Sequence, residues 1–138
     1  MHDRDHAARA LGISIVAVDH GAATVSMVVR QDMCNGHQIC HGGYMALLCD
    51  TAFAYACNSY NMNTVASGFS IEILAPAKLG DTLVAVAVEQ VLRGRHGIYD
   101  VTMSNQHHER IALFRGKSAP IAGFVIPDTS VVSRQLCR

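Results

Sequence analysis

The alternation of apolar and polar residues predicts short elements in the first third of the chain. A short helix is expected within residues 3–11, because Gly12 follows and can adopt the left-handed conformation that ends helices. Two segments rich in β-branched residues then flank His20-Gly21, a dipeptide typical of a tight turn; they are ISIVAVDH (13–20) and AATVSMVVR (22–30). The pattern predicts a short helix, a β-hairpin and then a loop over residues 36–43.

The longest apolar run of the chain predicts a single long helix. It reads HGGYMALLCDTAFAYACN and covers residues 41–58. From about Gly43 to Asn58 it is rich in alanine, leucine and methionine, which favour helices, and it has the length of roughly four turns. One carboxylate, Asp50, stands near its middle.

The second half of the chain alternates strand-like segments with short turns. The segments are TVASGFSIEILA (64–75), TLVAVAVEQVL (82–92), IYDVTMSN (98–105) and RIALFRGKSAPIAGF (110–124). Short turns join antiparallel neighbours, so these four strands are expected to form a meander in chain order. The chain is therefore predicted to be one α+β domain over residues 1–138, with an antiparallel sheet wrapped around one buried helix. The tail over residues 128–138 shows no pattern and is expected to be mobile.

Composition excludes several classes of protein. The chain has 138 residues, 16% charged residues and a net charge of zero, which argues against a nucleic-acid partner recruited by bulk charge. No apolar run reaches the roughly 20 residues of a membrane span, and the N-terminus lacks an apolar signal core, so we expect a cytoplasmic protein. Its five cysteines are odd in number, which is typical of reduced thiols rather than a disulfide framework.

Asp50 stands out because the helical positions around it are apolar. The residues three and four positions away on the same face are Ala46, Leu47, Phe53 and Ala54. A buried, unpaired carboxylate costs several kcal/mol, so such a group is usually paired, raised in pKa or exposed to a wet cleft. A structural carboxylate that caps a neighbouring turn is one interpretation; a functional carboxylate is the one we favour.

The start of the same helix offers donors for an oxygen atom. His41-Gly42-Gly43 places two residues without side chains where free N–H groups and the positive end of the helix dipole point outward. Such donors suit a carbonyl oxygen that gains negative charge, and each contributes about 3 to 4 kcal/mol to lowering a barrier.

The spacing of Gly43 and Asp50 predicts a dimer. Seven residues separate them, which places them on nearly one face of the helix but about 10 Å apart along its axis. One helix therefore cannot easily present both to one carbon atom. A second copy packed antiparallel across a two-fold axis would bring its Asp50 to the first copy's Gly43. We expect a homodimer with composite active sites.

These residues belong to a longer stretch that resembles a known family. NGHQICHGGYMALLCDTAFAYACN (35–58), with GFSIEILAPAKLGDTL and LFRGKS further on, resembles the hot-dog-fold acyl-CoA thioesterases of the phenylacetate-degradation (PaaI) type. The resemblance covers roughly residues 10–120. It implies a hot-dog fold, hydrolysis of aryl- or phenylacetyl-type (hydroxyphenylacetyl-CoA-like) thioesters to free acid and CoA, and a homotetramer built from dimers.

The resemblance also implies roles for individual residues. The Gly43 amide would polarise the thioester carbonyl, Gly42 would allow its close approach, and His41 and Asn35 would shape the site. Asp50 of the opposite subunit would act as nucleophile, through a mixed anhydride, or as general base on water, and the sequence leaves both open. No metal and no separate cofactor is expected, because CoA enters as part of the substrate.

The coenzyme's phosphates need a local group of basic residues. If the last hairpin turns at Gln106 and His107, Lys117 lies opposite His96 and Arg115 opposite Ile98. The basic residues expected to bind the phosphates would then gather at one end of the sheet. They are Arg93, Arg95, Arg115 and Lys117. Solvated turn charges are the alternative. Four apolar side chains of the helix either form the walls around the acyl group or belong to the ordinary core. They are Tyr44, Met45, Leu48 and Phe53.

Three other functions compete with this one. A zinc site could use the closely spaced Cys34, His37, Cys40 and His41, although structural zinc sites usually pair two separated knuckles. A hot-dog hydratase would need a catalytic histidine beside its acid, and none is near Asp50 in the sequence. A non-catalytic acyl-CoA-binding protein would bind the ester without releasing the thiol.

Overall fold

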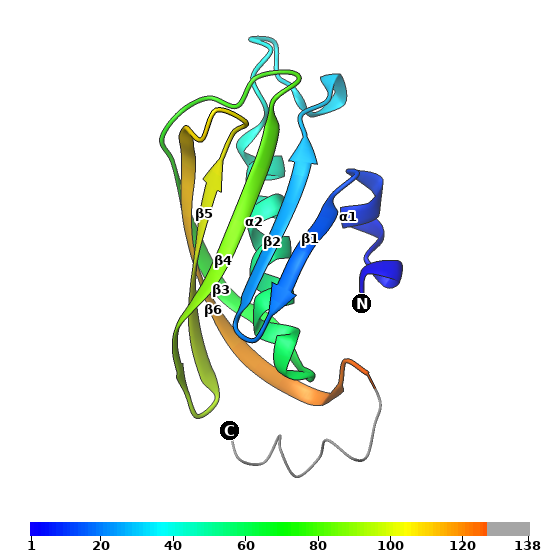
Figure 1. Ribbon diagram of the computed structural model, residues 1–138, viewed down its shortest axis with the longest axis vertical. Helices are drawn as coiled ribbons and strands as arrows, with labels where there is room; N and C mark the ends of the chain where they lie inside the picture. The colour runs from blue at the N-terminus through cyan, green and yellow to red at the C-terminus, as the bar shows by residue number, and fades with distance from the viewer. Residues whose placement is uncertain (127–138) are drawn as a thin grey trace.

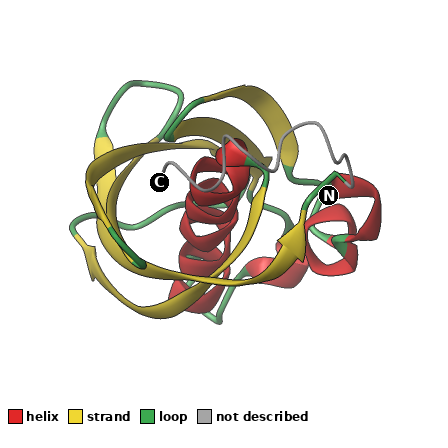
Figure 2. Cartoon of the chain, turned by 90° about the horizontal axis from the view of Figure 1, so that it is seen from below, coloured by secondary structure: helices red, strands yellow, loops and turns green. Residues whose placement is uncertain are grey.

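A computed structural model of the chain describes residues 1–126, and the tail predicted at residues 128–138 lies outside them. One six-stranded antiparallel sheet curls around one long helix (Figures 1 and 2). The helices are η1 (His2–Arg4), α1 (His6–Ala10), η2 (Gln31–Met33), α2 (Gly42–Cys57) and η3 (Asn58–Tyr60). The strands are β1 (Ser14–Asp19), β2 (Ala22–Val28), β3 (Met62–Ile73), β4 (Thr82–Arg93), β5 (His96–Ser104) and β6 (Arg110–Phe124).

The N-terminal elements form as predicted. Asp5 caps α1, because its Oδ1 accepts a hydrogen bond of 3.1 Å from the Ala8 N–H, and Gly12 follows the helix with a φ of +69°. β1 and β2 make the predicted hairpin around Gly21, whose φ of +73° requires a residue without a side chain.

The predicted central helix is confirmed as α2, and it forms the core of the domain. Leu48, Cys49, Ala52 and Ala56 are all 0% exposed, because the sheet surrounds most of the helix (Figure 2). At its middle the ring of Phe53 lies over β6, where a Cβ on Gly116 would come within 2.9 Å of the ring. Nearly the whole circumference of α2 is apolar, as expected for a helix buried on several sides.

The predicted meander is wrong for its first strand. The order of strands is β1-β2-β4-β5-β6-β3, so β3 lies beside β6 at an edge and not beside β4. β3 and β4 run in opposite directions, and residues 74–81 pass over the end of the sheet between them (Figure 1). Eight residues span up to roughly 26 Å, whereas three strand spacings need only about 15 Å, so a short connection can skip two strands.

The predicted register of the last hairpin is wrong by two residues. Arg115 lies opposite Asp100, and Lys117 lies opposite Ile98. The reason is a longer loop, in which Asn105 Oδ1 accepts hydrogen bonds from the N–H groups of His107 and Glu109, together with an irregularity at the end of β5. A shift of two keeps each side chain on its expected face but changes its partner across the strands.

Candidate active site

The first turn of α2 presents two free backbone donors. The N–H groups of Tyr44 and Met45 both point to the carbonyl oxygen of the N-cap residue His41, at 3.1 and 3.5 Å. The N–H groups of Gly42 and Gly43 have no acceptor among residues 1–126. The His41 side chain is exposed and makes no capping hydrogen bond. An oxygen atom can therefore approach this end of the helix and accept from the backbone.

The two glycines serve different purposes. A Cβ on Gly42 would lie 2.9 Å from the Cδ1 atom of Ile73, so this position allows the helix to approach β3 closely. A Cβ on Gly43 would meet nothing within 4 Å. Gly43 therefore faces open space and Gly42 faces protein, so close packing within the chain is sufficient to explain the glycine at position 42.

Asn35 shapes the loop that leads into α2. Its side-chain Oδ1 accepts hydrogen bonds from the N–H groups of His37 (2.9 Å) and Ile39 (3.3 Å). On the opposite side of this loop the His41 N–H donates to the Met33 carbonyl oxygen at 2.9 Å. Asn35 and His41 thus belong to one small hairpin that positions the start of the helix.

Asp50 is half-buried near the middle of α2 and has no hydrogen bond or ion pair within residues 1–126. Burial raises the pKa of its carboxyl group above the ordinary 3.8, and the negative charge of Asp5 raises that pKa further. The cap that the structural interpretation required is therefore missing in the described part of the chain. An unpaired carboxylate of raised pKa is typical of a functional group.

Gly43 and Asp50 lie on the same open stripe of α2. The less buried positions of the helix include Gly43, Leu47, Asp50 and Ala54, which recur at the spacing of one helical face. The sheet covers the remainder of the helix. The free donor and the unpaired carboxylate thus share a surface, about two turns apart.

The sequence did not indicate that the N-terminal segment lies near this stripe. Asp5 is close enough to raise the pKa of both Asp50 and Tyr55, and Ala8 of α1 is buried. The sequence holds no signal for this packing, because nothing in a local pattern specifies which element a short helix covers.

Other residues of α2 are ordinary core. Of the four residues expected to line the acyl group or the core, Met45, Leu48 and Phe53 are at most 1% exposed, and only Tyr44 is partly accessible. These three side chains therefore fill the interior of the monomer. The buried Thr51 hydroxyl donates to the Leu47 carbonyl oxygen at 2.7 Å and is therefore satisfied within the helix.

The expected basic cluster is only partly free. Arg115 binds Asp100 in a fork, with Nε to Oδ1 at 2.6 Å and Nη2 to Oδ2 at 2.8 Å, and these hydrogen bonds lower the pKa of Asp100. Arg95, in the β4–β5 turn, makes a long hydrogen bond of 3.4 Å to the Pro120 carbonyl oxygen. Arg93 flanks that turn, and Lys117 is exposed on β6.

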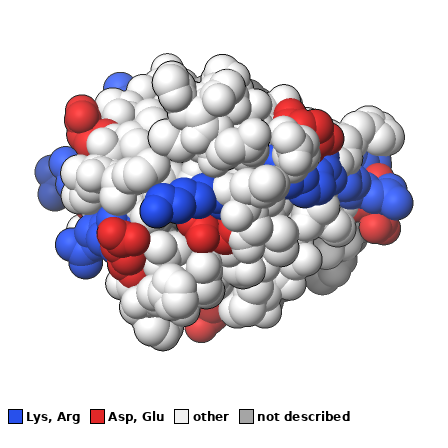
Figure 3. Space-filling view, turned by 90° about the horizontal axis from the view of Figure 1, so that it is seen from above, with Lys and Arg blue, Asp and Glu red and all other residues white. Residues whose placement is uncertain are grey.

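At the opposite end of the molecule, above α2, the visible surface is largely uncharged and basic groups lie beside acidic ones (Figure 3).

The zinc interpretation has no support in the geometry. The thiols of Cys34 and Cys40 donate to the carbonyl oxygens of Arg30 (3.4 Å) and His41 (3.5 Å). No group of three or more histidine, cysteine or acidic side chains in the described residues could hold a metal ion.

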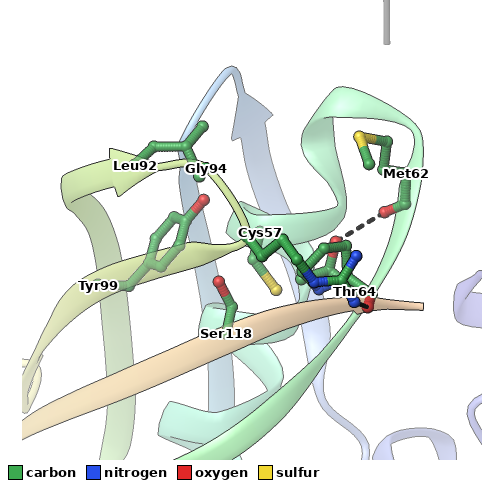
Figure 4. Close-up of a pocket in the computed structure, with 9 residues that line it drawn as sticks. Cys57, Met62, Thr64, Leu92, Gly94, Tyr99 and Ser118 are labelled. Carbon is green, nitrogen blue, oxygen red and sulfur yellow. Dashed lines mark hydrogen bonds between the residues drawn. The ribbon is translucent and has the colours of Figure 1, made fainter. Parts of the chain in front are cut away.

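A small cavity that the sequence did not indicate lies at the other end of α2. It has a volume of about 50 Å³ and lies beneath the β4–β5 turn (Figure 4). Cys57, Tyr99 and Ser118 line it from three different elements. The Tyr99 hydroxyl donates to Glu89 Oε1 at 3.1 Å, and the Ser118 hydroxyl is near the Gly97 carbonyl oxygen at 3.5 Å. The residues that line this cavity are far apart in the sequence, so only the folded chain brings them together.

Within residues 1–126, no helix has the length and apolar character that crossing a membrane requires.

Comparison with known proteins shows the family and the fold of the chain. Residues 37–112 match the thioesterase superfamily. The acyl-coenzyme A thioesterase PaaI of Escherichia coli is 48% identical over 125 residues, which cover 91% of this chain and 89% of the relative. The structure of E. coli PaaI superposes with a TM-score of 0.88 over 90% of each chain.

More distant structures share the fold. A variant of the phenylacetic acid degradation protein PaaI from Thermus thermophilus is 32% identical, with a TM-score of 0.81 over 85% of this chain and 100% of the other. A Streptococcus mutans protein bound to acetyl-CoA is 26% identical, with a TM-score of 0.77 over 80% of this chain and 90% of the other. The chain belongs to the thioesterase superfamily and, within it, to the hot-dog-fold acyl-CoA thioesterases of the PaaI type.

Proposed function

We propose that this enzyme hydrolyses aryl- or phenylacetyl-type CoA thioesters, such as hydroxyphenylacetyl-CoA, at sites shared by two subunits. The observation that carries the mechanism is an unpaired, half-buried Asp50 on the same open stripe of α2 as the free Gly43 N–H. The proposed substrate class is supported by one relative, the E. coli acyl-CoA thioesterase PaaI, a protein from a phenylacetic acid degradation operon.

In this mechanism the helix terminus polarises the thioester. The Gly43 N–H donates to the carbonyl oxygen, which gains negative charge as the tetrahedral intermediate forms, and such a donor lowers the barrier by about 3 to 4 kcal/mol. The positive end of the α2 dipole favours the same charge. His41 and Asn35 act as positioning residues, because they hold the loop that sets the direction of this N–H.

Asp50 of the partner subunit supplies the attack. Its raised pKa makes the carboxylate a stronger base than an exposed aspartate, which suits either removal of a proton from water or direct attack on the carbonyl carbon. In both routes the C–S bond breaks and CoA leaves as the thiolate. A single turnover in ¹⁸O-water with enzyme in excess identifies the nucleophile route if water attacks the aspartyl carbon of the anhydride, because an unlabelled aspartate oxygen then leaves in the product acid and ¹⁸O remains on Asp50.

A dimer is supported by an uncovered apolar surface on the edge strand β3. The edge strand β3 has no neighbour on its outer side within the described chain, and it exposes Val65, Phe69 and Ile73 at 45%, 51% and 48%. Edge strands of this kind pair readily with a second chain. Antiparallel pairing of two β3 strands would place the open stripes of two α2 helices side by side. We further propose that two such dimers assemble into a tetramer.

The CoA phosphates are assigned to the basic residues around the β4–β5 turn. Arg93, Arg95 and Lys117 have no ion-pair partner among residues 1–126, whereas Arg115 is held by Asp100. Arg115 therefore contributes least to this site. No metal or separate cofactor takes part, so activity is expected to survive treatment with a chelator.

A thiol-release assay with a panel of acyl-CoA esters tests the proposal. Aryl- and phenylacetyl-type esters should be cleaved fastest, and sedimentation should show that the active species is a dimer or larger. Tight binding of every ester without thiol release would exclude hydrolysis, and an active monomer would exclude the composite site.

A further inference from the structure

Cys34 and Cys40 lie directly opposite each other in the small hairpin that precedes α2. Two hydrogen bonds bracket the pair: the Asn35 N–H donates to the Ile39 carbonyl oxygen and the His41 N–H donates to the Met33 carbonyl oxygen, both at 2.9 Å. This pattern defines a non-hydrogen-bonded antiparallel pair, in which Cα atoms are about 4.5 Å apart and side chains leave the same face. That spacing falls within the range of roughly 4.4 to 6.8 Å that disulfides require.

The two thiols are free and differ in accessibility. Cys34 is partly exposed, whereas Cys40 is 4% exposed. Burial raises the pKa of Cys40 to about 11, and the nearby charge of Cys34 adds to this shift. Both side chains now point to backbone carbonyl oxygens, so rotation about the Cα–Cβ bonds is sufficient to turn the sulfur atoms toward each other.

We propose that Cys34 and Cys40 form a reversible disulfide that closes the loop over residues 35–39. The oxidant is a small-molecule disulfide such as oxidised glutathione. The Cys34 thiolate attacks one of its sulfur atoms and releases one glutathione thiolate. The Cys40 thiolate then attacks the Cys34 sulfur and releases the second. Two protein thiols lose two protons and two electrons, and one glutathione disulfide becomes two glutathione molecules.

The bond would be accessible to reducing thiols, because Cys34 is partly exposed, and exposed disulfides are the labile ones. The other described cysteines, Cys49 and Cys57, are buried in α2, where burial raises the pKa of each to about 12. Oxidation is therefore expected at the pair before α2 and not at the thiols within it.

The disulfide acts on the site described above, and this consequence rests on the proposed function. Cys34 directly precedes Asn35, and Cys40 directly precedes His41. A bond between the cysteines removes the thiol hydrogen bonds to the Arg30 and His41 carbonyl oxygens, and these bonds help to hold the hairpin that positions the Gly43 N–H. Oxidation should lower kcat by about threefold or more, because small displacements of positioned groups are costly.

The intact protein is equilibrated in glutathione buffers of stepwise redox potential, its remaining thiols are alkylated, and peptides are mapped by mass. We expect a Cys34–Cys40 link with a loss of about 2 Da, reversal by dithiothreitol, and free thiols at Cys49 and Cys57. Cys34→Ser and Cys40→Ser should each abolish the link, whereas Cys57→Ala, the matched control, should keep it. Full alkylation of both thiols in the most oxidising buffer, or linkage of another pair, would overturn the proposal.

Activity is measured on the same samples. We expect oxidation to lower the kcat of the parent enzyme and to leave the kcat of Cys34→Ser unchanged. An unchanged kcat in linked enzyme would overturn the regulatory consequence, while the mass data would still establish the disulfide. If no CoA ester is cleaved in any redox state, the proposed function fails, and the mass assignment of the link stands or falls separately.

Discussion

The Asp5 carboxylate, at the N-cap of α1, raises the pKa of the Asp50 carboxyl group in the middle of α2. The two residues are far apart in the sequence, and their proximity arises because α1 packs beside α2. After burial, the charge of Asp5 is the largest cause of that raised pKa. The N-terminal helix therefore influences the charge state of the group that we assign to catalysis.

Asp5→Asn is expected to lower the pKa of Asp50. Removing a negative charge makes the ionised form of Asp50 less costly, while asparagine keeps the capping hydrogen bond of α1. If the carboxylate is the active form, the acid limb of the kcat profile should move to lower pH. Asp3→Asn is the control, because Asp3 does not contribute to the pKa of Asp50. A profile unchanged in Asp5→Asn would contradict this coupling.

Asp50→Asn should remove activity and increase stability near neutral pH. The loss of kcat is expected to be about 10²-fold to 10⁴-fold, the usual contribution of general acid–base catalysis. The folded pKa of Asp50 lies above its unfolded value, so between the two the folded state binds more protons. The contribution of Asp50 to the free energy of unfolding therefore falls as the pH rises above about 4, and this contribution is unfavourable at pH 7. Thermal melts at pH 7 should show a higher Tm than for the parent and for the exposed control Glu72→Gln.

Gly43→Ala should reduce kcat without unfolding the protein. Its new Cβ meets nothing within 4 Å in the chain, so the methyl group occupies the space where the ligand approaches. We expect a loss of about tenfold or more, since the donor must contact an oxygen directly. Gly36→Ala, also in open space but in the preceding loop, is the matched control for thiol-release assays. Equal activity of the two variants would remove Gly43 from the mechanism.

Arg95→Ala and Lys117→Ala should raise KM for CoA esters, and Arg115→Ala should not. A charged hydrogen bond to phosphate contributes about 1.5 to 3 kcal/mol, equivalent to roughly tenfold or more in KM. The effect should be larger at low salt, where screening is weak. Arg115 is occupied by Asp100, and this exposed pair contributes little to stability. A rise in KM confined to Arg115→Ala would reverse the assignment.

Gly116→Ala should destabilise the fold. The added methyl group would lie 2.9 Å from the Phe53 ring, which packs between Tyr99 and Phe114 and cannot retreat easily. Overpacking of this kind costs about 1 to 3 kcal/mol, which urea unfolding can measure. Gly68→Ala on the neighbouring strand β3, where the methyl group meets nothing within 4 Å, should unfold like the parent.

The amino-acid sequence alone was sufficient to predict most of the elements. The end of α1 at Gly12, the turn at Gly21 and the apolar run of α2 depend on residues close together in the chain, and these elements are confirmed. The spacing of Gly43 and Asp50 predicted that they share one face of the helix, and the motif around them identified the family. Local backbone preference and helical periodicity are properties of short segments, so they can be read without the fold.

Only the tertiary structure decided which distant segments meet. In the folded chain β3 pairs with β6 and not with β4 as predicted. Arg115 lies opposite Asp100, and Asp5 lies near Asp50. The local pattern is compatible with either neighbour for β3, and a two-residue shift of register leaves every side chain on the same face. The choice between such alternatives depends on how the curved sheet closes around α2, and that packing energy is shared among many residues that no short stretch of sequence contains.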